Sequence, residues 1–182
     1  SVEDIIRKVE KEVEEVVEKV ERILDTVRRR SEKVLRENKE ILEEVKRRAD
    51  KVLRDVERNS KDKDLERVLE EVKRRVEELL DRNRKVLEEI EKRNRDLLRE
   101  VEESIRRLKK EVDDLSEEVR NKPEEVAKRL EDRVREIVRT LEDLVREIVR
   151  RSEESVRRSR ESAKRVVDTV KRIVDELEKR VR

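Results

Sequence analysis

Paired carboxylates, and serines that follow arginines, are the side chains of this sequence with potential for catalysis or binding. Glu14-Glu15 and Asp113-Asp114 are adjacent carboxylates, the groups that serve acid–base catalysis and bind divalent cations. Arg157-Arg158-Ser159 places a hydroxyl after two guanidinium groups, a spacing typical of phosphorylation sites and nucleic-acid-binding arms. What these groups can do depends on the elements that position them.

The residue types that are missing exclude most enzyme chemistry. The chain has no histidine, cysteine, methionine, glycine, phenylalanine, tyrosine or tryptophan. Thiol nucleophiles, imidazole bases, zinc fingers and disulfides are therefore excluded, and so are aromatic cages and glycine-rich phosphate loops. We expect no enzyme, no catalytic residue, no cofactor and no metal site. Enzyme chemistry survives only as carboxylate or lysine chemistry.

The charge pattern indicates a soluble chain without a nucleic-acid or membrane partner. Lys and Arg number 54 against 52 Asp and Glu, and the two signs are interleaved, so no large basic face is expected to hold phosphates. No apolar run approaches the ~18 residues that would cross a membrane, and no signal-peptide stretch follows Ser1. The paired carboxylates are expected to lie on this solvated surface, in salt-bridge ladders.

Only two places interrupt the helical pattern. Residues 59–63 are polar, and Asp62 or Asp64 can cap a new helix there. The second break is 121–125, where Pro123 suits the first turn of a helix. We expect the asparagine in each loop to adopt the left-handed conformation at a helix end, as glycine usually does. The sequence thus predicts helices over about 2–58, 64–120 and 123–181.

The apolar spacing repeats every eighteen residues, which is five turns of a straight helix. Apolar doublets in the first helix begin in steps of eleven and seven residues, at Ile5, Val16, Ile23, Val34, Ile41 and Val52. Seven-residue and eleven-residue repeats twist in opposite senses, so their alternation predicts nearly straight, untwisted helices. The same template recurs in all three segments, and short loops make neighbours antiparallel. We predict an all-α, antiparallel up-down-up bundle of three long helices, forming one elongated domain over residues 1–182.

Polar residues occupy several predicted core positions of this template. The register places Asn38, Asn83 and Ser159 in one layer, and it places Ser31 and Ser152 in a second layer with Asn94 about one turn away. A buried asparagine without a partner costs about 1–3 kcal/mol, so we interpret these residues as two hydrogen-bond networks that disfavour slipped or reversed packings. The alternatives are solvated polar positions and a small-molecule pocket. Ser155 and Ser162 extend the stripe, whereas Ser104 is expected to bond its own helix.

With these features the chain resembles de novo designed, parametrically generated helical bundles with buried hydrogen-bond networks. The resemblance covers the whole length and rests on the repeat, the Asn38/Asn83/Ser159 layer, the loop at 121–125 and the missing residue types. Such proteins are usually structural in purpose and very stable. Designed bundles often carry loop glycines and a tyrosine or tryptophan, which are absent here. Natural spectrin-like three-helix repeats are a poorer match, because they normally carry tryptophan and lack a strict repeat.

The resemblance implies a designed structural scaffold without natural activity or natural location, expressed recombinantly in the bacterial cytoplasm. We expect a monomer that requires no partner. The alternative is an interaction module that homo-oligomerises or accepts an additional helix, because apolar doublets on every helix also suit a larger bundle. In either case Arg157-Arg158-Ser159 is an incidental spacing, since Ser159 is expected in the core.

Overall fold

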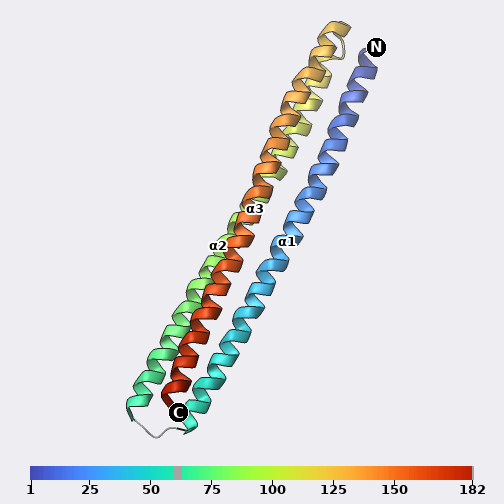
Figure 1. Cartoon of the computed structure of the whole chain (residues 1–182). Coiled ribbons are helices and arrows are strands. Elements are labelled where there is room, and N and C mark those ends of the chain that lie inside the picture. The colour runs from blue at the N-terminus through green and yellow to red at the C-terminus, as the bar shows by residue number, and fades with distance from the viewer. Residues whose placement is uncertain (60–62, 182) are drawn as a thin grey trace. The chain divides into compact units, whose positions relative to one another are not determined.

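The chain folds into three long α-helices (Figure 1). The computed structural model describes residues 1–59 and 63–181, the last of these in its backbone only. The helices are α1 (Val2–Asn59), α2 (Lys63–Val119) and α3 (Glu124–Val181). The all-α prediction is confirmed, and the predicted helix limits differ from the observed ones by one residue at most. The part of the first loop prediction that concerns residues 60–62 lies outside the described residues.

The N-terminal ends of the helices carry acidic residues, as their positive dipole ends favour. Each first turn has two, namely Glu3 and Asp4, Asp64 and Glu66, and Glu124 and Glu125. The Asp4 amide also donates a hydrogen bond to Ser1 Oγ (3.3 Å), so Ser1 caps α1. A side-chain hydrogen bond from Ser1 to the Asp4 carboxylate, together with the N-terminal ammonium, holds the pKa of that carboxyl below its usual value.

The prediction that the loop asparagines adopt the left-handed conformation is wrong for the asparagines that the structure describes. No described residue has a positive φ, and Asn59 is still helical. At the second loop the Lys122 amide donates to the Val119 carbonyl oxygen (3.0 Å). This right-handed turn satisfies a carbonyl at the end of α2, so no left-handed residue is needed. Pro123 stands just before α3, and its carbonyl oxygen accepts the amide of Val126 (3.0 Å).

The backbone contacts divide the chain into two compact units. Unit 1 comprises Ser1–Arg30 and Arg93–Glu153, and unit 2 comprises Ser31–Lys92 and Glu154–Arg182. Each unit contains part of all three helices. The single domain over 1–182 stays a prediction.

The core of unit 1 is apolar and drawn from all three helices. Side chains every three or four residues along each helix meet in one cluster that includes Ile6, Val101, Leu108, Val134 and Ile148. Ile6, Leu108 and Ile148 are 1–2% exposed, and burial of each is worth about 1.5–3 kcal/mol. Because β-branched valine is stiff, the many valines narrow the packings available to this core.

Ion pairs across unit 1 give the directions of its helices. Glu3 on α1 pairs with Arg120 on α2, and Arg28 further along α1 pairs with Glu102, which lies earlier in α2. These two helices are therefore antiparallel. On α3, Glu124 pairs with Ser1 at the N-terminus, and Glu153 pairs with Arg30, so α1 and α3 run parallel. The predicted up-down-up bundle is confirmed in this unit.

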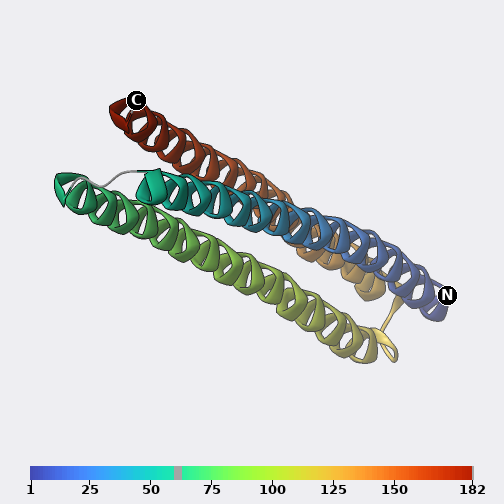
Figure 2. The ribbon, with the colours of Figure 1, turned by 90° about the horizontal axis from the view of Figure 1, so that it is seen from below.

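Unit 2 has the same arrangement of helices (Figures 1 and 2). Lys39 pairs with Glu91 and Glu57 pairs with Lys73, so α1 and α2 are again antiparallel. The buried apolar side chains form two clusters, one containing Leu42, Leu80, Leu87, Ile90 and Val170 and a smaller one containing Leu53, Val56, Leu69 and Leu177. The up-down-up prediction is confirmed here as well.

Candidate functional site

Seven polar side chains are buried among the described residues. They are Ser31, Asn38, Asn83, Asn94, Ser116, Ser152 and Ser159, with exposed fractions between 0% and 9%. Six of them are the residues singled out from the sequence. Burial removes these groups from solvent, so the hydrogen bonds that each one makes within the protein determine its energetic contribution.

Asn38 and Ser159 lie together in unit 2. Asn38 Nδ2 on α1 donates a hydrogen bond to Ser159 Oγ on α3. Ser159 is completely buried and Asn38 nearly so. This pair was placed in one layer by the repeat, and it joins two helices through a hydrogen bond that is protected from water.

Asn83 on α2 bonds a different serine. Its Nδ2 donates to Ser162 Oγ (2.6 Å), about one turn along α3 from Ser159. The Oδ1 atom of Asn83 is buried and accepts no hydrogen bond from the described residues. Asn38 on α1 and Asn83 on α2 thus donate hydrogen bonds to two different serines of α3.

Asn94 differs from the other two asparagines. It is 9% exposed, and neither Nδ2 nor Oδ1 makes a hydrogen bond within the described part of the chain. Ser31 in unit 2 and Ser152 in unit 1 are also buried, and each has an interaction partner. Among the described residues, Asn94 is therefore the buried side chain with the most polar atoms that lack a hydrogen-bond partner.

Ser116 is a buried polar residue that the sequence analysis missed. It is 2% exposed, and its Oγ has no hydrogen-bond partner among the described residues. The signal was present, because Ser116 is the second member of a doublet with Leu115, and second members such as Ile6, Leu24 and Leu53 are buried. Ser104, the other serine in an α2 doublet, donates to the Glu100 carbonyl oxygen (3.0 Å) as expected.

We expect Ser116→Ala to raise the free energy of unfolding by about 1 kcal/mol. The change removes a buried hydroxyl that lacks a partner and introduces the better helix former. Denaturant unfolding followed by helical circular dichroism measures the effect, since the chain has no aromatic fluorophore. Ser104→Ala is the control and should change stability by less than about 0.5 kcal/mol. A loss of stability in Ser116→Ala would mean that the hydroxyl is bonded.

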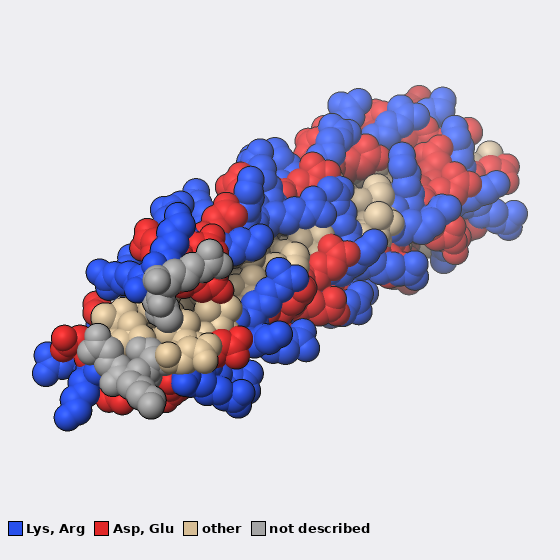
Figure 3. Space-filling model, turned by 60° about the horizontal axis from the view of Figure 1, so that its bottom comes forward, with Lys and Arg blue, Asp and Glu red and all other residues tan. Residues whose placement is uncertain are grey.

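The side chains capable of acid–base chemistry lie apart from this buried set. Glu14, Glu15, Asp113 and Asp114 are all exposed. In the described part of the chain no group of three or more Asp or Glu residues is arranged to hold a metal ion. Acidic and basic side chains are interspersed over the face in Figure 3, and many pair at i,i+4 spacing, as Arg48 does with Glu44 (2.8 Å). Such exposed pairs contribute at most about 0.5 kcal/mol each.

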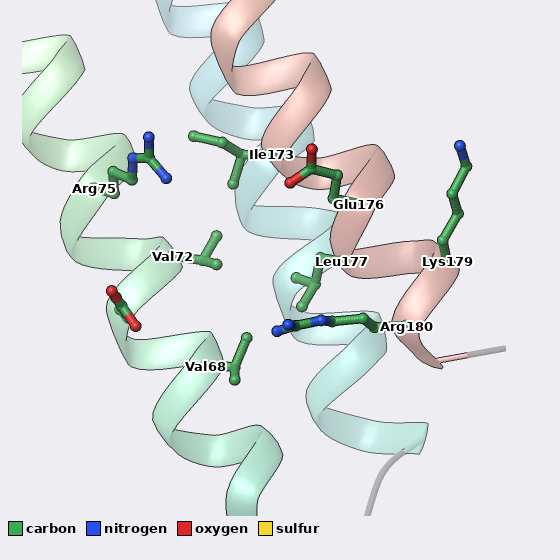
Figure 4. Close-up of a pocket in the computed structure, with 9 residues that line it drawn as sticks. Val68, Val72, Arg75, Ile173, Glu176, Leu177, Lys179 and Arg180 are labelled. Atoms are coloured by element: carbon green, nitrogen blue, oxygen red, sulfur yellow. The ribbon is translucent and has the colours of Figure 1, made fainter.

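An open groove lies between α2 and α3 in unit 2 (Figure 4). Val68 and Val72 point from α2 toward Ile173 and Leu177 on α3, and the groove has a volume of about 450 Å³. Charged side chains border it, among them Glu71, Arg75, Glu176, Lys179 and Arg180. Elsewhere in this unit Ile41 is 43% exposed, which makes it the one exposed large apolar side chain of the described residues.

The described helices contain no apolar stretch long enough to cross a membrane. Comparison of the chain with protein-family models, with curated proteins and with solved structures finds no match.

Proposed function

We propose that this chain is a designed structural scaffold without natural biochemical activity, whose buried amide–hydroxyl pairs select one arrangement of the helices. In this proposal the chain needs no partner or cofactor, and it is a synthetic protein produced by recombinant expression. One observation carries the proposal: Asn38 and Asn83, from two different helices, each donate to a different serine of α3. The absence of matching families and structures is consistent with such an origin.

The eighteen-residue repeat explains why a scaffold of this kind needs polar selection. A repeating template of apolar positions buries similar side chains when a helix is shifted by one repeat or when the helix order is reversed. In a shifted arrangement, Leu141 or Leu177 takes the position of Ser159 beside the Asn38 amide. Each amide left unpaired costs about 1–3 kcal/mol, so the amide–hydroxyl pairs penalise these alternatives. Short loops restrict sliding within one chain, so reversed order and exchange of helices between chains are the main competitors.

The experiment replaces all four paired residues together, as Asn38→Leu, Asn83→Leu, Ser159→Ala and Ser162→Ala. We expect the unfolding free energy to stay the same or rise, because apolar packing replaces polar pairs. At the same time we expect more than one set of amide signals in a heteronuclear NMR spectrum, from coexisting helix arrangements. A single set with the parent's dispersion would contradict the proposal. Asn94→Leu is the matched control and should keep one set, because the Asn94 amide has no partner to lose.

The second candidate is an interaction module that accepts an additional helix or a second copy. The groove between α2 and α3 favours it, because Val68, Val72 and Ile173 offer an apolar strip between two helices. An amphipathic helix could lie in such a groove, as in helix-in-groove recognition.

Light scattering separates a monomeric scaffold from a module that binds a second copy of itself. A solution mass near 22.2 kDa at all concentrations supports the scaffold as a monomer, and a mass near twice that value supports self-association. If the chain dimerises, Val72→Lys tests whether the groove is responsible, because a charge there disrupts an apolar contact. Arg74→Lys, an exposed change on the same helix, is the control.

A further inference from the structure

Among the described residues the buried apolar side chains form three clusters and not one. All residues of the largest cluster belong to unit 1, and all residues of the other two clusters belong to unit 2. Val72 packs against both clusters of unit 2 and so joins them. Since buried apolar area supplies most of the stabilising free energy, each unit contains its own source of stability.

On each helix the change from one unit to the other falls beside a buried polar residue. In α1 the first residue of unit 2 is the buried Ser31, and in α2 the change follows Lys92, two residues before the buried Asn94. In α3 it follows Glu153, next to the buried Ser152 and before Ser159. Every helix therefore has polar core positions where its apolar stripe passes from one cluster to another.

These polar positions stabilise the bundle less than apolar residues would. A buried leucine contributes about 1.5–3 kcal/mol, whereas a buried amide atom without a partner costs about 1–3 kcal/mol. Both polar atoms of Asn94 and one of Asn83 are in that state. Local stability follows the density of buried apolar contacts, so we expect it to be lowest around the polar residue at each boundary.

We propose that the two units are separate cooperative folding units. The amides of residues 1–30 and 93–153 open together, and those of 31–59, 63–92 and 154–180 open together, each set with its own free energy. The scaffold can then lose the structure of one unit while the other stays folded. This inference does not depend on the proposed function, because it concerns the apolar clusters and not the choice between helix arrangements.

Native-state hydrogen exchange with two matched variants tests the proposal. Leu87 and Leu108 both lie on α2, are 1% and 2% exposed, and belong to units 2 and 1 respectively. Alanine at either position keeps a strong helix former while it removes core packing. We expect Leu108→Ala to speed exchange about 100-fold in unit 1 and less than about threefold in unit 2. Leu87→Ala should do the reverse.

The proposal is overturned if either variant accelerates exchange similarly in both units, so that the accelerations in unit 1 and unit 2 differ by less than about tenfold. A second experiment tests the role of the polar residues. In a background of Asn83→Leu and Asn94→Leu, the effect of Leu108→Ala should extend into unit 2, because apolar residues then continue the core of α2. If the effect stays confined to unit 1 in that background, the polar residues do not set the boundary and the proposed cause is wrong.

Discussion

Asn94→Leu raises the free energy of unfolding by about 2–4 kcal/mol, the largest stabilisation that we expect from a single substitution. Both polar atoms of the Asn94 amide are buried without a partner, and each such group costs about 1–3 kcal/mol. Leucine has the same number of non-hydrogen atoms and the same branching at Cγ, so it fills the site without much overpacking. Guanidinium unfolding followed by circular dichroism gives the change in midpoint and slope.

Asn83→Leu is the matched control for this prediction. Its amide has one unpaired atom, but the other atom donates to Ser162 Oγ, and that bond is lost on substitution. The gain in stability should therefore be clearly smaller than for Asn94→Leu. If Asn94→Leu destabilises the protein, the Asn94 amide has a hydrogen-bond partner and the interpretation of that core position is wrong.

Asn38 and Ser159 are expected to be coupled by about 1–2 kcal/mol in a double-mutant cycle. Asn38→Ala removes the donor and leaves a small cavity, so it should lower the unfolding free energy by about 2 kcal/mol. Ser159→Ala leaves the buried Asn38 amide without its acceptor and should cost about 1 kcal/mol or more. The double variant should lose less than the sum, because each single change already removes the same bond.

A distant pair provides the reference for this cycle. Lys73 lies beside Glu57, which is about 28 Å along α1 from Asn38 by helix rise. Asn38→Ala and Lys73→Ala should therefore be additive within about 0.5 kcal/mol. A coupling between Asn38 and Ser159 as small as this reference would show that their contact contributes nothing to the choice of packing.

The helices, their order and their directions follow from the sequence because the repeat and the loops both act locally. Eighteen-residue periodicity places the inward residues, and the proline turn ends α2 within one residue of its predicted end. The burial of Asn38, Asn83 and Ser159 follows from the same template. The conformation of Asn121 could not be predicted in this way. The Lys122 amide closes a right-handed turn by an i,i+3 hydrogen bond, and local preference alone does not decide between this turn and a left-handed asparagine.

The hydrogen-bond partners were harder to predict than the burial. The template placed Asn83 opposite Ser159, but the Asn83 side chain bonds Ser162, one turn away. Two serines of α3 are within reach of an amide in that layer, and their side-chain rotamers decide which one accepts the bond. The unpaired state of Asn94 has the same origin, because a periodic template states which positions are inside but not whether two polar atoms meet.

The distance between α1 and α3 in unit 2 tests most directly whether buried pairs select the helix arrangement. The chain has no cysteine, so Glu40→Cys and Glu161→Cys introduce two unique spin-label sites at exposed positions of these helices. We predict one narrow distance distribution in the otherwise unchanged chain. The variant that replaces Asn38, Asn83, Ser159 and Ser162 should show a second distance or a distribution broadened by about 5 Å, half the spacing of packed helices. An identical narrow distribution in both proteins would contradict the claim.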